Sequence, residues 1–574
     1  MLFALRLIIL ILLVGISTSA SAENINFITE HFSGSGNCSQ CHDKLTDSEG
    51  EDVSIVRAWS GSMMANASKD PFWQAKVATE LKRNPQLEDA INDKCSKCHA
   101  PMANYEQSGV VTIFGEDGLL DLSNPFYDAT LDAVSCTYCH QIEDSVEMGT
   151  DNGFSGNAEI SSDKLVYGQF NPDDIDMMLT ITGYTPVFGE HISSSEMCAT
   201  CHNLKTPYVD ASGNVVGDDF PEQMPYTEWE NSIFDDAGSN PMSCQDCHMP
   251  TTSALVSTSP IWLQEREGFA KHNFASANTV VLTLLKENAG EFNVDPESID
   301  ENIALSRQFL QEAASVEILS AVFDGNELVA HLRLTNNSGH KTPTSFPSRR
   351  MWLNFRVIDS VGNVVFESGA VNPDGSIDGS DNDTDHLKFE PHYDLITSAD
   401  QVQIYESVLG DTDGKVTQTL LRAAEYLKDN RLTPAGFDKN RVPYDVAVRG
   451  DALDDLNFNS GKDEITYRIK NLLPDELSIE VSLNYQPLSH GFINDLFRED
   501  DLPEVSRLKS MYESQILKYE VMASATTTVE TIEKVESNGG CSVSGARSVI
   551  DPTLPILVIA GLASIGLRHR MAHS

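Results

Sequence analysis

The chain has 574 residues, with 86 acidic and 39 basic side chains and a formal net charge of −47. A surface this acidic repels nucleic acid and anionic lipid head groups, so we exclude both as binding partners, whereas a basic protein partner fits the charge. One hydrophobic core rarely serves a chain of this length, so we expect two domains and a tail.

Residues 1–22 have the pattern of a secretory signal peptide. Arg6 is followed by an apolar run that ends at Ile16 and by small residues that end at Ala22. A basic residue, a short apolar stretch and a small-residue site in this order predict cleavage after Ala22. The apolar run is too short for a membrane span. We therefore expect an exported protein, located in the periplasm or at the cell surface.

Five copies of the sequence Cys-x-x-Cys-His, here called motifs 1 to 5, lie between residues 38 and 248. Their cysteines are Cys38 and Cys41, Cys95 and Cys98, Cys136 and Cys139, Cys198 and Cys201, and Cys244 and Cys247. Their histidines are His42, His99, His140, His202 and His248. This spacing attaches haem c, because the two thiols bind the porphyrin and the adjacent histidine reaches its iron.

Two other readings of the motifs are weaker. Zinc takes four ligands from paired half-sites, which an odd number of identical motifs fits poorly. Disulfides would not require a histidine after every second cysteine. We therefore predict five covalently bound haem c groups, with the five motif histidines as the proximal iron ligands.

The composition changes near residue 313. Residues 23–305 contain all five motifs, with helical patches over 71–83 and 222–232 among loops rich in Gly, Asp, Ser and Asn. From 313 to 525, short β-branched or aromatic runs alternate with turns, which is typical of a β sandwich. We predict strands over 316–322, 327–335, 351–359, 364–368, 464–470 and 476–483, and helices over 417–427 and 505–521. The predicted fold is α+β: a loop- and helix-rich multihaem cytochrome c domain, a mostly β, sandwich-like domain, and an apolar tail helix.

Each six-coordinate iron needs a second, distal ligand, and methionine in that position raises the reduction potential relative to histidine. Four histidines outside the motifs are the first candidates: His191, seven residues before motif 4; His272, at the end of the first domain; His340, in a Gly/Pro loop; and His392, after a proline. His331 alternates within a predicted strand and is expected to be a sheet residue. The remaining three, His31, His386 and His490, stay open.

Met64, in the pair Met63-Met64, is the alternative distal ligand, although methionines beside aromatic residues more often serve packing. Two Asp-rich loops, 374–385 and 411–414, offer oxygen ligands for calcium. Neither loop matches an EF-hand, so we interpret both as solvated loops.

The C-terminus holds a linker over 526–552, with Cys541 as the single cysteine outside the motifs, and an apolar segment over 553–574 that ends in basic residues. A membrane span usually needs about 20 apolar residues, so this segment is marginal. It resembles the Myxo- and JDVT-type sorting tags of Gram-negative bacteria, which implies processing or lipidation at Cys541. The alternative is a plain membrane anchor with an incidental thiol.

The motifs, with segments 63–73, 98–102 and 247–250, resemble the multihaem cytochromes c of respiratory bacteria, a group that includes hydroxylamine oxidoreductase and its tetrahaem electron acceptor. Segments 339–344 and 428–432 resemble a β-rich extension of such cytochromes. The resemblance implies closely stacked haems, with distal ligands such as His191, His272 and His340. All five motifs end in histidine, whereas pentahaem nitrite reductases carry a lysine in the catalytic motif, and hydroxylamine oxidoreductases have eight haems. Neither enzymatic activity is therefore implied.

Three functions remain open from the sequence. The first is an electron carrier, membrane-tethered through its C-terminal segment, that exchanges electrons with a donor, such as a quinol-linked or periplasmic one, and with an acceptor protein. The second is an oxidoreductase in which one five-coordinate haem acts on a small nitrogen or sulfur species. The third is a binding protein that uses the β domain, for which no aromatic-rich face is evident. We favour the electron carrier.

Overall fold

The structure is a computed structural model that describes residues 25–259, 263–472 and 476–531. The predicted signal peptide, Cys541 and the apolar tail helix lie outside these residues. All described residues belong to one compact unit. Within them, no helix combines the length and the apolar character that a membrane crossing requires.

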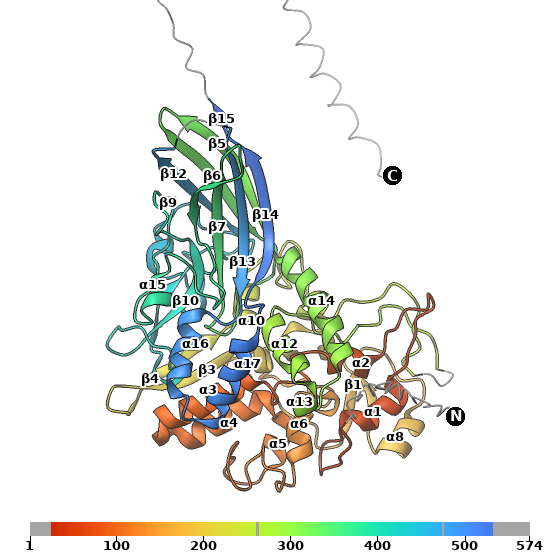
Figure 1. Cartoon of the computed structure of the whole chain (residues 1–574). Helices are drawn as coiled ribbons and strands as arrows, with labels where there is room; N and C mark the ends of the chain where they lie inside the picture. The colour runs from red at the N-terminus through yellow and green to blue at the C-terminus, as the bar shows by residue number, and fades with distance from the viewer. Residues whose placement is uncertain (1–24, 260–262, 473–475, 532–574) are drawn as a thin grey trace, which may run out of the picture. The chain divides into compact units, whose positions relative to one another are not determined.

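The haem-motif part of the chain is built from short helices and loops (Figure 1). Its helices are α1 (Ser35–His42), α2 (Ile55–Ser60), α3 (Pro71–Arg83), α4 (Glu88–His99), α5 (Pro101–Glu106), α6 (Tyr127–Leu131), α7 (Cys136–Cys139), α8 (Ile175–Thr182), α9 (Ser195–His202), α10 (Pro225–Glu230), α11 (Cys244–His248), α12 (Thr279–Glu287), α13 (Ala289–Phe292) and α14 (Pro296–Ala313). Two small sheets lie among them: β1 (Leu165–Gly168) with β2 (Thr185–Phe188), and β3 (Leu204–Val209) with β4 (Val215–Gln223).

Helix α3 has the bounds expected from the sequence, and its start shows why. The Asp70 carboxylate accepts hydrogen bonds from the backbone N–H groups of Phe72 (2.7 Å) and Trp73 (3.2 Å), and Pro71 occupies the first helical position. An aspartate cap followed by proline is a strong helix-start signal. The helix predicted over 222–232 is shorter, because β4 runs to Gln223 and α10 begins only at Pro225.

The C-terminal half forms two mainly antiparallel sheets. One has the strand order β11-β10-β7-β13-β14, with β8 also paired to β7, and the other has the order β15-β5-β6-β12-β9. The strands are β5 (Ala314–Asp324), β6 (Glu327–Asn336), β7 (Arg350–Ile358), β8 (Val364–Ser368), β9 (Leu395–Ile396), β10 (Ile404–Gly410), β11 (Glu425–Asp429), β12 (Lys462–Lys470), β13 (Ser478–Gln486), β14 (Glu520–Thr528) and β15 (Glu530–Thr531). All six predicted strands are present.

The two sheets pack face to face through one hydrophobic core. Buried residues alternate with half-buried ones along the interior of β12, as expected for a strand with one face in the core. Phe355 of β7 and Tyr467 of β12, which come from different sheets, stack with ring centroids 3.9 Å apart. The sandwich-like architecture expected from the sequence is therefore present within an α+β fold.

The helix predicted over 417–427 is wrong. Residues Leu420–Arg422 form a short 3₁₀ turn, and β11 follows and pairs with β10. Leu420 and Leu421 are instead buried against α3 and α4. The second predicted helix, over 505–521, is observed as α17 (Pro503–Ser514), and the chain then enters β14.

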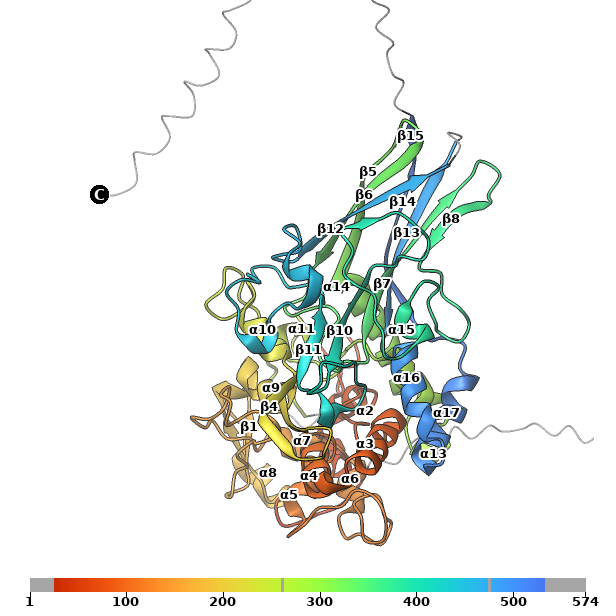
Figure 2. The ribbon, with the colours of Figure 1, turned by 90° about the vertical axis from the view of Figure 1, so that its left-hand side faces the viewer.

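The motif part and the sandwich share two hydrophobic cores. In one core, α16 (His490–Leu496) and α17 pack against α3, α12 and α14. In the other core, β10 and the turn 420–422 pack against α3 and α4. Tyr426 of β11 also donates to the backbone carbonyls of Pro221 and Glu222 in β4, where the two parts meet (Figure 2). The sandwich is thus positioned to contribute side chains to the motif region.

Candidate haem-binding site

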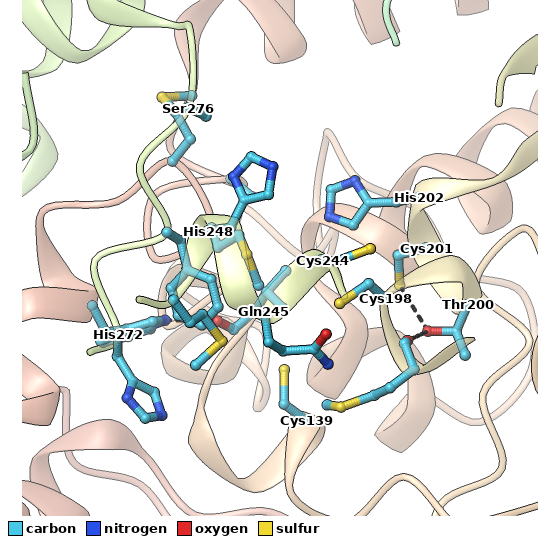
Figure 3. A pocket seen from close by; sticks show the side chains of 18 of the residues that line it. Cys139, Cys198, Thr200, Cys201, His202, Cys244, Gln245, His248, His272 and Ser276 are labelled. Carbon is cyan, nitrogen blue, oxygen red and sulfur yellow. Dashed lines mark hydrogen bonds between the residues drawn. The ribbon is translucent and has the colours of Figure 1, made fainter. Parts of the chain in front are cut away.

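All five motifs line one continuous cavity of about 1210 Å³. Figure 3 shows the part of its wall formed by motifs 4 and 5, with Cys139 of motif 3 and His272. Motifs 1, 2, 4 and 5 end the helices α1, α4, α9 and α11, and motif 3 forms α7 with His140 as the next residue. Helical spacing places the first cysteine of each motif, its second cysteine and its histidine at i, i+3 and i+4, which lie on one face of a helical turn. Each motif therefore presents two thiols and an imidazole together, as covalent attachment of haem c requires.

The ten motif cysteines are free, and several lie beside cysteines of another motif. Cys38 of motif 1 lies beside Cys136 of motif 3, and Cys98 of motif 2 lies beside Cys201 of motif 4. Motif 4 also adjoins motif 5, where Cys198 lies beside Cys244, and motif 3, where Cys201 lies close to Cys139. Motif 4 therefore has three neighbours, and the spatial order of the motifs differs from their order in the chain.

Among the residues that the structure describes, seven histidines line the cavity: the five motif histidines, His272 and His340. In six of them the ring atom Nδ1 lies 2.6–3.0 Å from a backbone carbonyl oxygen; the pairs are His42 with Thr258, His99 with Ala67, His140 with Tyr167, His248 with Ala275, His272 with Ala270, and His340 with Lys341. A carbonyl only accepts, so Nδ1 carries the proton and Nε2 keeps a free lone pair. Such a bond orients a metal-binding imidazole.

Two pairs of these imidazoles face each other across the space expected for one iron. The ring centroids of His140 and His272 are 6.4 Å apart, with 21° between the ring planes. Those of His248 and His340 are also 6.4 Å apart, with 16° between the planes. A metal held between two imidazole nitrogens, at about 2.0–2.1 Å from each, separates the ring centroids by about 6.3 Å. The residues present therefore fit haem iron with two histidine ligands at motifs 3 and 5.

Burial keeps these imidazoles in the neutral form that binds iron. It lowers the pKa of His99, His248 and His272 to about 4, and for His272 the neighbouring His140 lowers the pKa further. Burial likewise lowers the pKa of His340. At neutral pH these rings need not lose a proton before they bind a metal.

His272 and His340 face motifs 3 and 5. Among the described residues, the cavity lining therefore offers no further histidine as a second ligand at motifs 1, 2 and 4. Met64, the predicted alternative ligand, does line the cavity, and Met63, Met177 and Met178 line it as well. At motif 2, the ring of His99 stacks on the indole of Trp73, with centroids 4.7 Å apart and 10° between the planes.

The structure does not bring His191 to the cavity lining. His191 is buried in the 3₁₀ turn Glu190–Ser193, and its Nε2 donates to the carbonyl of Ile142 at 2.9 Å. Nε2, the ring nitrogen that is free of a carbonyl partner in the six cavity histidines above, is thus engaged by the backbone in His191. We leave His191 out of the ligand set that we propose.

His392 lies in the sandwich, also away from the cavity lining, and both of its ring nitrogens are engaged. Nδ1 accepts from the amides of Gln403 (2.8 Å) and Asn430 (3.1 Å). The oxygens of these amides accept from backbone N–H groups, which fixes the orientation of both amides. Nε2 then carries the proton and donates to Asp455 at 3.2 Å. No lone pair is left for iron, so the predicted role of His392 as a distal ligand is not supported.

The remaining histidines and the acidic loop also lie outside the cavity lining. His331 is exposed in β6 and hydrogen-bonds to Thr466, as expected for a sheet residue. In the loop 374–385, Asp383 forms an ion pair with Arg350 and Asp374 accepts from Ser376. Among the described residues, this loop contributes to no cluster of side chains that could hold a metal ion.

Prediction from the sequence missed several polar residues that line the cavity, among them Glu222, Arg349 and Tyr485. Burial raises the pKa of the Glu222 carboxyl to about 7. The Tyr485 hydroxyl is buried with no hydrogen-bond partner among the described residues, and Arg349 lies near it. No motif marks these residues, because each comes from a strand or loop that reaches the cavity only in the folded chain.

A match to one family model supports a multihaem c-type cytochrome. Residues 37–141, which contain motifs 1 to 3, match the family model described as cytochrome c554 and c-prime. A penta-haem cytochrome c552 from Thermochromatium tepidum has a similar structure, with a TM-score of 0.49, 15% sequence identity, and coverage of 87% of this chain and 99% of that one. None of the curated proteins compared with the chain matches it.

Proposed function

We propose that the protein is an exported multihaem c-type cytochrome that transfers electrons through five covalently bound haems in an extracytoplasmic or respiratory chain. The observation that carries this proposal is the pair of facing imidazoles at motif 3 and again at motif 5, with ring centroids 6.4 Å apart in both. Two histidine ligands close an iron to substrates and favour electron exchange over chemistry at the metal.

Haem c, when bound, supplies one-electron chemistry, and the polypeptide sets where and at what potential it occurs. The ten cysteines attach the cofactor, and the carbonyls at Nδ1 hold the imidazoles in one orientation. His340, which follows β6, brings the sandwich into the ligand set of motif 5.

The contacts between motifs support transfer within the molecule. Each motif adjoins at least one other through its cysteines, and motif 4 adjoins motifs 2, 3 and 5. Motif 5 is the one with a cysteine, Cys247, that is exposed to solvent. We infer that electrons enter or leave the protein near motif 5, from or to a partner whose basic surface complements the net charge of −47.

The location and the wider relationships are part of the same proposal. Attachment of haem c outside the bacterial cytoplasm and the leader-like residues 1–22 support a periplasmic or cell-surface protein. The apolar residues 553–574 support membrane tethering, through a Myxo- or JDVT-type tag that is processed at Cys541. Kinship with the hydroxylamine oxidoreductase group is proposed on the motifs alone.

Electron paramagnetic resonance of the ferric protein tests the function. We expect low-spin signals from at least two haems with two histidine ligands, and loss of one of them in His272→Ala. A spectrum that is high-spin throughout, or one unchanged by His272→Ala, would contradict the proposed ligands.

A second function is favoured by one observation. The motif histidines His42, His99 and His202 face no second histidine among the described cavity residues. If methionine closes none of these three sites, one haem stays five-coordinate and the protein is an oxidoreductase acting on a small nitrogen or sulfur species. A high-spin ferric signal in the wild-type protein that shifts on addition of nitrite, hydroxylamine or sulfite would favour this enzyme. An entirely low-spin spectrum would favour the carrier.

A further inference from the structure

Four charged side chains are buried together beside the loop that carries His340. They are Glu228 of α10, Lys341 of the loop, Asp429 at the end of β11, and Arg431, and we call them the buried charge cluster. The side chains of Glu228 and Lys341 are 0% exposed, that of Asp429 is 1% exposed and that of Arg431 is 6% exposed. Burial this deep is costly for a charge unless opposite charges and hydrogen bonds compensate it.

The contacts in the cluster are close and the charges balance. The Lys341 ammonium lies 2.6 Å from an Asp429 carboxylate oxygen. The Arg431 guanidinium donates to both oxygens of Asp429, at 2.9 and 2.7 Å. Its third nitrogen, Nη1, lies 2.9 Å from Glu228. Two carboxylates thus face two cations, and removal of any one of the four leaves an uncompensated charge away from water.

The cluster also anchors the backbone on both sides of His340. Glu228 accepts from the backbone N–H of Lys341 at 3.2 Å and from the Thr344 hydroxyl at 2.5 Å. Thr342 and Leu432, next to Arg431, exchange two backbone hydrogen bonds of 2.9 Å each. The carbonyl of Lys341 in turn accepts from Nδ1 of His340 at 2.9 Å. The segment 337–344 lies outside any named strand or helix, so these contacts replace a regular element as its support.

The cluster joins the two parts of the molecule. Glu228 belongs to α10, which packs against α9 and hence against motif 4, whereas Lys341, Asp429 and Arg431 come from the sandwich. The position of the His340 imidazole relative to motif 5 is therefore fixed across this junction. A small displacement there would move a distal ligand away from the axis of His248.

We propose that the buried charge cluster is a positioning device that holds His340 opposite His248 and so determines the axial coordination of the haem at motif 5. This inference rests on the proposed function, because it assumes that His340 is the distal ligand. Glu228, Lys341, Asp429 and Arg431 are positioning residues, because they act through His340 and not on the iron.

The test uses the purified full-length holoprotein and its ferric electron paramagnetic resonance spectrum. In Glu228→Gln, the uncompensated positive charge loosens the loop, and we expect the high-spin fraction to rise by up to one haem in five over wild type. The double variant Glu228→Gln with Arg431→Gln leaves one cation, Lys341, opposite one carboxylate, Asp429. Its high-spin fraction should therefore be lower than that of Glu228→Gln alone. A purely structural role would not produce this rescue.

Asp383→Asn is the matched control. It breaks another buried ion pair of the sandwich, in which the Arg350 side chain is 1% exposed and the Asp383 side chain 2%, at 2.6 Å, and neither residue lines the cavity. We expect this variant to lower thermal stability while its spectrum stays that of wild type. An equal high-spin rise in Asp383→Asn, or no rise in Glu228→Gln, would overturn the inference.

His340→Ala separates this inference from the proposed function. If His340→Ala converts one haem to high spin and Glu228→Gln does not, the positioning role fails while the ligand assignment stands. If His340→Ala leaves the spectrum unchanged, the ligand assignment itself fails.

Discussion

Glu222 gives the protein a pH dependence that can be worked out from the structure. Its carboxyl lies in the cavity wall at the end of β4, is 3% exposed, and accepts from Thr206 and from Gln223, each at 3.2 Å. The nearby cation, Lys76, is held by Glu80 at 2.7 Å and so does not pair with Glu222. Burial therefore dominates and raises the pKa of Glu222 from 4.5 to about 7.

Proton linkage gives the sign and the magnitude of the effect of Glu222 on the stability of the folded protein. Between pH 4.5 and 7 the folded protein keeps a proton on Glu222 that the unfolded chain has lost, so stability falls as the pH rises through this window. A raised pKa of this size corresponds to about 3 kcal/mol of lost stability above pH 7. Glu222→Gln has no carboxylate to ionise, so the variant should not lose this stability above pH 7.

Thermal unfolding of the holoprotein, followed by circular dichroism at pH 5 and at pH 8, measures the effect. We expect wild type and Glu222→Gln to unfold at similar temperatures at pH 5, and the variant to unfold a few degrees higher at pH 8. Glu317→Gln, at an exposed position of β5, serves as the control and should show no such change. A difference between wild type and Glu222→Gln that is the same at both pH values would refute the reasoning.

Three further predictions concern the ligands and the junction. In His272→Ala, one haem in five should become high-spin, as measured by electron paramagnetic resonance, whereas His331→Ala on the sheet surface should leave the spectrum unchanged. Phe492→Ala, in the core shared by α16 and α3, should cost about 3–5 kcal/mol and lower the unfolding temperature, and a loss below 1 kcal/mol would show that this contact is unimportant. His392→Ala should destabilise the sandwich by about 1–3 kcal/mol, because it leaves the Gln403 and Asn430 amides unpaired. If His392→Ala instead produces a new high-spin signal, His392 is an iron ligand after all.

Sequence patterns predicted the helices and strands whose formation depends mainly on neighbouring residues in the chain. Helix 71–83 has a capping aspartate and a proline at its start, and the strand at 464–470 alternates buried and half-buried residues. The motifs predicted their own histidines, because cysteine and histidine spacing lies within one helical turn. In contrast, residues 417–427 have a helical pattern, but Leu420 and Leu421 are buried against α3 and α4, and the following residues pair with β10.

The sequence narrowed the set of candidate distal ligands, but it could not show which candidates face a motif histidine. His272 and His340 pair with motifs 3 and 5, which lie far from them in the chain. His392 resembles His340 in its local sequence: His392 directly follows Pro391, and His340 lies in a loop three residues before Pro343. What separates the two is the environment supplied by other segments, since Gln403, Asn430 and Asp455 engage both ring nitrogens of His392. Tertiary contacts of this kind leave no trace in residue spacing.

The ratio of covalently bound haem to polypeptide tests the central claim most directly. Acidified acetone strips haem that is held only by its axial ligands, and the haem that remains is bound through cysteine thioethers. We predict that five haems per chain remain after extraction. A smaller number, or none, would contradict the assignment of the five motifs as haem-attachment sites.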